Sequence, residues 1–384
     1  MPLFTLEALQ AKHGDSLILH YGDESAPRFI LIDGGPGGVY QDTLRPRLTE
    51  IRKAWHSGPL PLEMVMVSHI DDDHVNGILD LTDELIKKKG DPVAEILCLW
   101  HNSFDDVLGN VDEDLFSRLS SKVKAAALGG PQPVEGFGVE RHVAAVAASV
   151  GQGRKLRSNA EKLDLRTNDP FEGLVLADGR GTRFDWGDGL ELTVLGPSLD
   201  RVKELHKKWE KDLEEKGAAK AIVAACTDGS VFNLSSIVVL AELGGKRMLL
   251  TGDARGDHIL KAVEDAGLLE NGRLHVDLLK MPHHGSDRNV DLGFFQTITA
   301  DHYVFSGDGG YGNPELATLR MVMGSRTDDG FTLHLTHRDG KNGLGAKIDG
   351  FLAERKAARR KFKMVFRKEG DRALKVDLHA PVAY

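Results

Sequence analysis

The sequence contains the stretch MVMVSHIDDDHVNGI at residues 64–78, where an apolar run leads into two histidines and three aspartates. The first four residues form a continuous apolar run, which is typical of a strand buried on both faces. From residue 75 onwards the apolar residues recur at helical spacing as far as residue 86. The stretch therefore predicts a buried strand, a polar loop and a helix, with the charged side chains gathered at the carboxyl end of the strand.

The polar loop has the composition of a metal site. Side chains two residues apart in an extended loop point the same way, so His69, Asp71 and Asp73 share one side. His74 stands where the helix begins, and the turn of the backbone there brings its imidazole toward the same point. Imidazole nitrogens and carboxylates suit zinc, manganese or iron, and this mixture could serve two ions. Helix capping by Asp72 or Asp73 explains one aspartate, but not three aspartates between two histidines.

Two later strands are expected to end in clusters of similar chemistry. Residues 247–250 lead into Thr251-Gly252-Asp253, and residues 276–280 lead into Met281-Pro282-His283-His284-Gly285-Ser286. A single aspartate after a strand is more often a turn residue than a ligand, whereas paired histidines before a glycine are rarely needed for packing. A buried, hydrogen-bonded role stays an alternative for one of the two histidines. Because layered α/β proteins place ligand-binding residues at one edge of their sheets, we expect these clusters to meet the first loop.

Two further polar residues, Asp33 and His101, also follow predicted strands. Asp33 precedes two glycines, and we expect it to position other residues or to cap the following turn rather than to bind metal. His101 stands alone after residues 96–100, and a lone histidine of this kind is expected to have a structural role.

The composition is that of a soluble globular protein, with 41% hydrophobic and 28% charged residues among 384. The formal net charge of −9 argues against a surface that simply coats nucleic acid. The two cysteines, Cys98 and Cys226, lie far apart in apolar surroundings, which suits a reducing compartment and argues against a thiolate metal site. No signal peptide and no run of roughly 20 apolar residues is present, so we expect a cytoplasmic protein without a membrane partner.

We expect residues 1–384 to form a single α/β domain with two additions. Residues 103–178 are largely polar with helical patterns, and we interpret them as a helical insertion that acts as a lid, a dimer contact or a substrate platform. Residues 351–384 are expected to form a basic helix followed by a hairpin. We interpret the basic run near residues 355–363 as a solvated helix face, with a weak phosphate-binding surface as the alternative.

These clusters, in this order, resemble the metallo-β-lactamase superfamily, and most of all the hydrolase domain of the DNA-uptake channel protein ComEC and its free-standing relatives. The resemblance implies an αββα sandwich. Seven ordered landmarks carry it: Gly14-Asp15, Ile32-Asp33-Gly34-Gly35, Ser68-His69-x-Asp71-x-Asp73-His74, Asn233-x-Ser235-Ser236, Leu250-Thr251-Gly252-Asp253, Pro282-His283-His284-Gly285-Ser286 and Ser306-Gly307.

The resemblance also implies a centre for two ions, Zn²⁺ or Mn²⁺. The implied ligands are His69 and Asp71 on the first ion, then Asp73, His74 and His284 on the second, with Asp253 bridging the two. Asp73, His74 and Asp253 would carry catalysis. Nuclease motifs such as Gly-His-Ala-Ser align their ligand with the second of the paired histidines, which leaves His283 as a partner that supports the ligands.

Two departures from the superfamily pattern His-x-His-x-Asp-His concern the first ion. Asp71 occupies the second histidine position, as in the ComEC-like group. Many members also place a metal-binding histidine before the bridging aspartate, but the comparable strand end here reads Val194-Leu195-Gly196-Pro197. The first site is therefore short of one protein ligand. Weak binding, a ligand recruited from elsewhere such as His101, or a shell completed by water and substrate would each account for this.

The expected function is metal-dependent hydrolysis, most of all as a phosphodiesterase or nuclease acting on nucleic acid or a nucleotide through a metal-bound hydroxide. This expectation depends on the ComEC-like resemblance and on the suitability of two ions for phosphoryl chemistry. Hydrolysis of a thioester, a lactone or a β-lactam is the second interpretation, since the same fold supports those reactions. A degenerate metal-binding module that binds a partner protein is the third.

Overall fold

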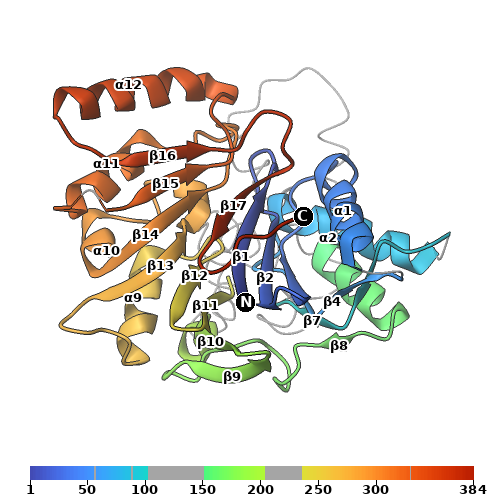
Figure 1. Ribbon diagram of the computed structural model, residues 1–384. Coiled ribbons are helices and arrows are strands. Elements are labelled where there is room, and N and C mark those ends of the chain that lie inside the picture. The colour runs from blue at the N-terminus through green and yellow to red at the C-terminus, as the bar shows by residue number, and fades with distance from the viewer. Residues whose placement is uncertain (56–57, 88–89, 103–150, 204–235, 329) are drawn as a thin grey trace, which may run out of the picture.

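Two β-sheets form the centre of the protein in its computed structural model (Figure 1). The structure describes residues 1–55, 58–87, 90–102, 151–203, 236–328 and 330–384. The first sheet has the order β17-β1-β2-β3-β5-β7-β8. Its strands are β1 Pro2–Leu9, β2 Leu17–Asp23, β3 Ala26–Ile32, β5 Met64–Met66, β7 Cys98–Trp100, β8 Arg166–Thr167 and β17 Ala373–Asp377. Strands β17 to β3 are antiparallel and strands β3 to β8 are parallel.

The second sheet repeats this arrangement in the order β16-β15-β14-β13-β12-β11-β10-β9. Its strands are β9 Thr182–Gly187, β10 Leu190–Gly196, β11 Val238–Leu243, β12 Lys246–Leu250, β13 Leu274–Lys280, β14 Ile298–Phe305, β15 Thr332–Leu335 and β16 Lys363–Phe366. Strands β9 to β12 are antiparallel and strands β12 to β16 are parallel. A separate pair joins β4 Leu60–Leu62 to β6 Ala94–Ile96.

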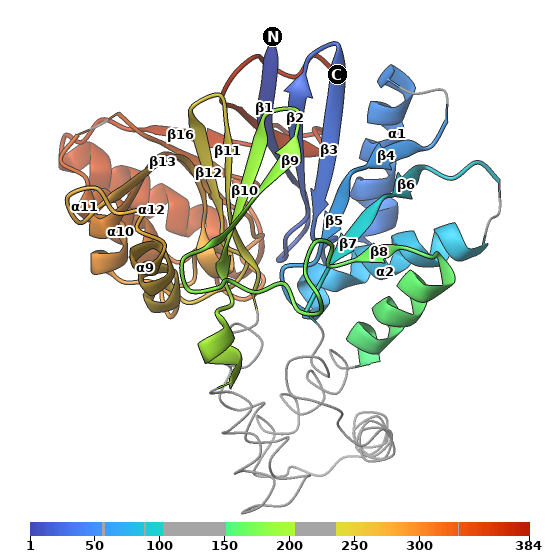
Figure 2. The same cartoon turned by 90° about the horizontal axis from the view of Figure 1, so that it is seen from below.

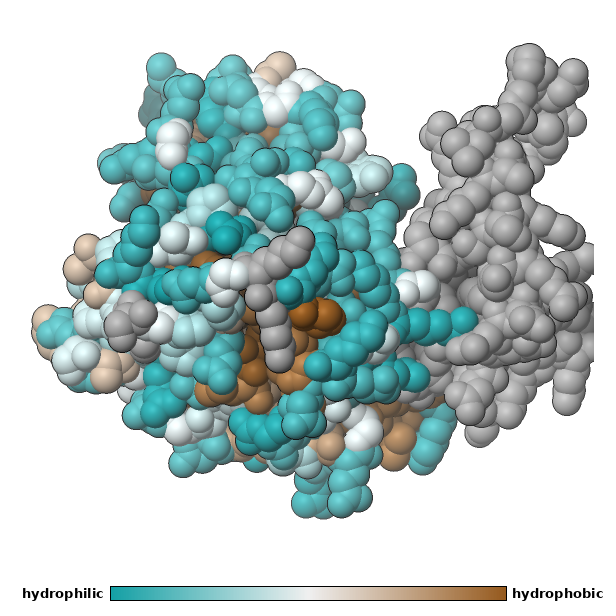
Figure 3. All heavy atoms as spheres, turned by 90° about the vertical axis from the view of Figure 1, so that its right-hand side faces the viewer, coloured by the Kyte–Doolittle hydropathy of each residue, from teal (hydrophilic) through white to brown (hydrophobic). Residues whose placement is uncertain are grey.

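Helices cover the outer face of each sheet (Figure 2). The first sheet is covered by α1 Arg45–Trp55, which follows the turn η1 Tyr40–Leu44, and by α2 Asp72–Lys87. The second sheet is covered by α9 Gly256–Asp265, α10 Leu292–Thr297, α11 Leu316–Ser325 and α12 Leu344–Ala357. Two short turns, η2 Pro282–Gly285 and η3 Lys341–Gly343, complete the described elements. The outer face of α1 and α2 is mostly hydrophilic, with a smaller group of hydrophobic side chains near its centre (Figure 3).

The inner faces of the two sheets share one apolar core. Phe4, Leu19 and Ile30 of the first sheet belong to the same buried cluster as Val239 and Leu278 of the second. Two other clusters lie between each sheet and its helices. The layers therefore follow the order helix, sheet, sheet, helix, which confirms the αββα sandwich predicted from the sequence.

The helical insertion predicted over residues 103–178 lies partly outside the described residues, which resume at 151. Residues 151–162 are helical and pack on α2, where Lys155 Nζ lies 2.7 Å from Asp83 Oδ2 and Asn159 Nδ2 lies 2.9 Å from Thr82 Oγ1. Strand β8 then pairs with β7 inside the first sheet. The predicted boundary at 178 is therefore too late, because the chain has rejoined the sandwich by Arg166.

The hairpin predicted within residues 351–384 is wrong. Strand β16 pairs with β15 in the second sheet, whereas β17 pairs with β1 in the first. The basic residues just before β16 have structural contacts: Arg355 lies over the Phe351 ring, and Arg360 donates to the backbone oxygen of Arg326, 3.1 Å away. Since Arg326 follows the C-terminal end of α11, these contacts lie away from the strand ends that gather the predicted site residues.

Candidate metal centre

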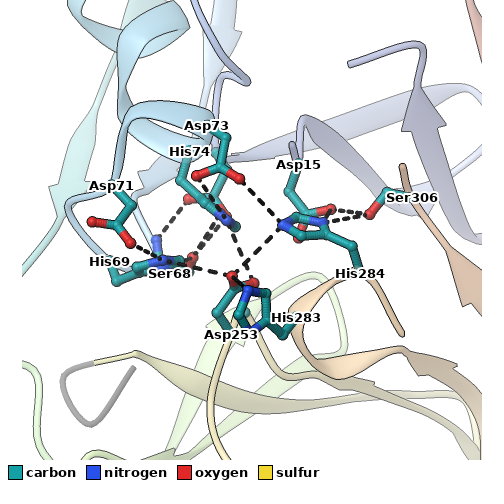
Figure 4. Close-up of polar contacts among 12 residues, drawn as sticks. Asp15, Ser68, His69, Asp71, Asp73, His74, Asp253, His283, His284 and Ser306 are labelled. Atoms are coloured by element: carbon teal, nitrogen blue, oxygen red, sulfur yellow. Dashed lines mark hydrogen bonds and ion pairs between the residues drawn. The ribbon is translucent and has the colours of Figure 1, made fainter. Parts of the chain in front are cut away.

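The predicted site residues meet at the carboxyl ends of strands from both sheets (Figure 4). The loop after β5 carries His69 and Asp71, and α2 begins with Asp72 and Asp73, followed by His74. The connection after β12 carries Asp253, and the turn after β13 carries the paired histidines. The two sheets pack face to face with these strand ends at the same side of the sandwich, and this packing brings residues 69 and 284 into one site.

Asp253 lies at the centre of this group. Its Oδ1 atom is 3.4 Å from His74 Nε2, and its Oδ2 atom is 3.6 Å from His284 Nε2 and 3.9 Å from His69 Nε2. These separations exceed those of hydrogen bonds, which are about 2.7–3.2 Å. Two ligands of one tetrahedral ion at about 2.1 Å are instead roughly 3.4 Å apart. The spacing is that of side chains arranged around a shared ion.

Asp71 and Asp73 extend the group on opposite sides of Asp253. Asp71 Oδ2 lies 3.5 Å from His69 Nε2, and Asp73 Oδ2 lies 3.5 Å from His284 Nε2. The structure thus brings together all six residues expected as ligands. Asp71 lies beside His69 and Asp73 beside His284, as the two implied ligand sets would require.

The atoms that face the centre are buried and lack hydrogen-bond partners. The side chains of His69, His74 and His284 are at most 2% exposed, and that of Asp253 is 4% exposed. Within the described part of the chain, Nε2 of each histidine and Oδ1 of Asp253 make no hydrogen bond. Burying polar atoms without partners is unfavourable, and it becomes favourable when a cation receives their lone pairs. The residues present therefore fit a metal ion of the kind that binds imidazole and carboxylate.

Asp33 fixes the orientation of His74. Its Oδ2 atom lies 2.8 Å from His74 Nδ1, and its carboxylate also accepts hydrogen bonds from the backbone N and Oγ of Ser68, both at 2.7 Å. With Nδ1 donating to a carboxylate, the lone pair of His74 is on Nε2, which points to Asp253. The structure places Asp33 in the positioning role expected from the sequence.

A second buried carboxylate, Asp15, acts on His284 in the same way. His284 Nδ1 lies 3.2 Å from Ser306 Oγ and 3.4 Å from Asp15 Oδ1, and Ser306 donates to Asp15. Lys280 Nζ lies 2.5 Å from the other oxygen of Asp15, and both of these side chains are only 1% exposed. Asp15 lies close enough to His74, Asp253 and His284 to be a ligand itself. Because Lys280 and Ser306 already occupy its oxygens, we assign it a positioning role.

Sequence reasoning did not identify the partners of Asp15. Gly14-Asp15 is only a landmark of the family resemblance, and no sequence pattern assigns Lys280 or Ser306 a role at the site. One local signal existed: Lys280 is the single cation that ends the apolar run Leu278-Leu279. A lysine at a fully buried strand end requires a buried anion, although the sequence does not say which one.

His101 and His283 occupy different positions relative to the centre. His101 is buried, and its backbone is paired with Asn168, which accepts from the His101 N at 2.8 Å and donates to its O at 2.9 Å. His283 is 34% exposed, and its Nε2 lies 3.5 Å from Asp253 Oδ2. His284 is thus the buried member of the pair and His283 the more open one. Of the landmark 233–236, only Ser236 lies within the described residues.

The charges of the site raise the affinity of its histidines for protons. Burial alone lowers the pKa of His284, but the carboxylates of Asp253 and Asp15 outweigh it and raise that pKa to about 9. The pKa of His74 is also raised, because Asp253, Asp33 and Asp73 outweigh burial. Burial raises the pKa of Asp253, but the three histidines His284, His283 and His74 outweigh it and hold that pKa well below its usual range.

These shifts predict that metal binding strengthens as the pH rises. In the metal-free protein His284 holds a proton below pH 9, and an incoming ion must displace it. We expect the affinity for Zn²⁺ or Mn²⁺ to rise about tenfold per pH unit for each displaced proton, and to level off above about pH 9. Calorimetric titration in buffers of different ionisation enthalpy measures both the affinity and the proton release. A pH-independent affinity would contradict the assignment of His284 as a ligand.

Comparisons with known proteins give weak matches. No protein-family model and no functionally curated protein matches the sequence. A crystal structure provisionally described as a metal-dependent hydrolase from Parabacteroides distasonis matches at 10% identity, over 85% of this chain and 90% of that one, with a TM-score of 0.33. Zinc-bound PqqB from Methylobacterium extorquens matches at 12% identity, over 97% of this chain and all of that one, with a TM-score of 0.35. TM-scores this low give no information about the chemistry of the site. That chemistry is inferred from the side chains of this protein, which form a buried histidine–aspartate cluster suited to metal.

Proposed function

We propose that this protein is a metal-dependent hydrolase of the metallo-β-lactamase superfamily that cleaves phosphodiesters in nucleic acid or nucleotides. One observation carries the proposal: buried Nε2 atoms without hydrogen-bond partners surround both oxygens of Asp253, with a further carboxylate on each side. This arrangement suits two ions that share one carboxylate. Two such ions stabilise the attacking and the leaving oxygen of an in-line displacement at phosphorus.

His69 and Asp71 would hold the first ion, and Asp73, His74 and His284 the second, with Asp253 between them. When bound, such ions supply an acidified water and polarise a phosphoryl oxygen at neutral pH. Asp71 and Asp73 are 36% and 21% exposed, whereas the imidazoles behind them are buried. The substrate would therefore approach over these two carboxylates, where a proton released from the attacking water can be held.

Ser68 and Ser306, two serines beside the centre, are engaged in positioning. Ser68 donates to Asp33, and Ser306 donates to Asp15. Neither hydroxyl has a histidine available as a base, because the lone pairs of the neighbouring rings are on the Nε2 atoms that face the centre, which leaves a proton on each Nδ1 atom beside the hydroxyls. The arrangement supports direct attack by water rather than a covalent intermediate on the chain.

A cavity of about 560 Å³ lies beside the connection that carries Asp253, is lined by none of the six expected ligands, and is large enough for a nucleotide-sized group. Its lining includes Ala254, the residue after Asp253, together with Ser236 and the cations Arg201 and Lys261. It opens where the chain has Gly196-Pro197 in place of the superfamily histidine. The cavity supports a small or end-bound substrate more than a long duplex.

The test combines metal content with activity. The purified protein would be loaded with Mn²⁺ or Zn²⁺ and assayed on single-stranded DNA, duplex DNA, RNA and bis-p-nitrophenyl phosphate, beside Asp73→Asn. We expect metal-dependent cleavage that falls at least about a hundredfold in Asp73→Asn, since loss of a ligand should exceed the 10–100-fold effect of supporting partners. His275→Ala is the control, because His275 on β13 is 54% exposed and faces Asp301 on β14.

The alternatives give distinct results in the same experiment. Stoichiometric metal without phosphodiester cleavage would contradict the phosphodiesterase proposal and favour thioester, lactone or β-lactam substrates. Absence of both metal and activity would indicate a binding module instead.

A further inference from the structure

We propose that His283 is a direct ligand of the first ion and supplies the imidazole that Val194-Leu195-Gly196-Pro197 does not provide. The inference rests on the proposed metal-dependent function and concerns the site of His69 and Asp71. Together with the shared Asp253, that site has one histidine and two carboxylates as ligands. One further nitrogen ligand would complete a four-coordinate site.

The position of His283 matches those of the other ligands. Its Nε2 atom lies 3.5 Å from Asp253 Oδ2, compared with 3.6 Å for His284 Nε2 and 3.9 Å for His69 Nε2 from the same oxygen. All three distances are near the roughly 3.4 Å separation of two ligands on one tetrahedral ion. Figure 4 shows the His283 ring beside Asp253. An imidazole that only supported a ligand would instead donate to it at hydrogen-bond distance.

The hydrogen bonds of Asn289 determine which nitrogen of His283 is free to bind metal. Asn289 Nδ2 donates to the backbone oxygen of Asp253 at 3.2 Å, which sets the orientation of the amide. Asn289 Oδ1 therefore faces His283 Nδ1, 2.8 Å away, and Nδ1 must be the donor. The neutral ring then carries its lone pair on Nε2, opposite an oxygen of Asp253. Two such acceptors facing each other at 3.5 Å repel unless a cation lies between them.

The unusual backbone angles of the turn are also explained if both His283 and His284 are metal ligands. His283 and His284 both have left-handed backbone angles, with φ of 47° and 55°, which residues other than glycine rarely adopt. The His283 backbone is held on both sides, since its N donates to Gly252 O at 3.1 Å and its O accepts from Asn313 Nδ2 at 3.1 Å. The turn is thereby fixed in the one conformation that directs both consecutive imidazoles toward Asp253.

The test is an equilibrium Zn²⁺ titration against a competing chelator, with bound metal counted by mass spectrometry of the dialysed protein. We expect two ions in the unmodified protein. In His283→Ala we expect one tight ion and a second weakened by more than a hundredfold, beyond the 10–100-fold effect of a supporting residue. Asn289→Ala retains the imidazole but not its hydrogen bond, so it should weaken the same ion by about tenfold. His275→Ala serves again as the exposed-histidine control, and the far-ultraviolet circular dichroism of each variant checks folding.

Double variants identify which ion His283 serves. His69→Ala combined with His283→Ala should lose little more metal than His69→Ala alone, because both remove ligands of one ion. His74→Ala combined with His283→Ala should lose both ions. Unchanged affinity for two ions in His283→Ala would overturn the inference and leave the proposed function standing. If two ions bind and His283→Ala weakens one of them, but no phosphodiester is cleaved, the proposed function is overturned and the inference stands. Failure of the unmodified protein to bind metal would overturn both.

Discussion

Asp253→Asn is expected to remove both ions and to lower phosphodiesterase activity by roughly a thousandfold or more, well beyond the effect of losing a supporting partner. The substitution preserves the size of the side chain but removes the charge that faces three buried imidazoles. Without that charge, the second ion would keep one carboxylate and two histidines, and the shared position between the ions would be lost. Metal content and kcat/KM with bis-p-nitrophenyl phosphate measure the two effects.

Asp169→Asn is the matched control for this prediction. Asp169 follows β8, is 52% exposed, and is paired with Arg166 at 3.1 Å. Its substitution should leave metal content and activity within about twofold, since exposed ion pairs contribute little. A variant Asp253→Asn that kept two tightly bound ions would refute the central position assigned to this residue.

Lys280→Met is expected to lower the free energy of unfolding by about 3–5 kcal/mol, which is the usual cost of removing one partner of a buried ion pair. The change would leave the Asp15 carboxylate, 1% exposed, with Ser306 and the more distant His284 as its polar neighbours. Urea denaturation in the presence of a chelator measures the effect independently of metal binding. In the unmodified protein Lys280 and His284 outweigh burial and hold the pKa of Asp15 well below its usual range. Loss of Lys280 removes the larger of these two effects, so burial raises the pKa of Asp15 in the variant.

A double variant separates the ion pair from simple packing. In Lys280→Met combined with Asp15→Asn no buried charge is left unpaired, so most of the lost stability should return. If the double variant is no more stable than Lys280→Met, the effect comes from packing of the lysine stem rather than from its charge.

The sequence is sufficient to predict the ligands that depend on local spacing. His69, Asp71, Asp73 and His74 lie within six residues, so the change from strand to helix alone brings them to one point. Asp253 and the paired histidines could be added because strand ends in layered α/β proteins share an edge. The alternation of strands and helices predicts a layered α/β protein, whereas the αββα sandwich is implied by the family resemblance.

Contacts between distant segments could not be predicted in this way. Lys280 and Asp15 are 265 positions apart, and nothing in the sequence around either residue indicates that they form an ion pair. The hairpin error has the same origin, since β16 and β17 are neighbours in sequence and alternate like a hairpin. Their real partners, β15 and β1, are determined by which sheet edges are free. The tautomer of His283 likewise depends on Asn289, whose orientation is set by the backbone of Asp253.

The pairing of β17 with β1 has a consequence for how the protein is made. Thr5 lies opposite Asp377, so the ribosome completes one strand of this pair 372 residues before the other emerges. During that time β1 can pair with β2 only, and its other edge offers unsatisfied N–H and C=O groups to any extended chain nearby. The edge of β15 that β16 later covers is exposed in a similar way for a shorter time. Nascent chains should therefore depend on chaperones that shield strand edges, and translation that stalls before residue 363 should yield aggregates rather than a partly active enzyme.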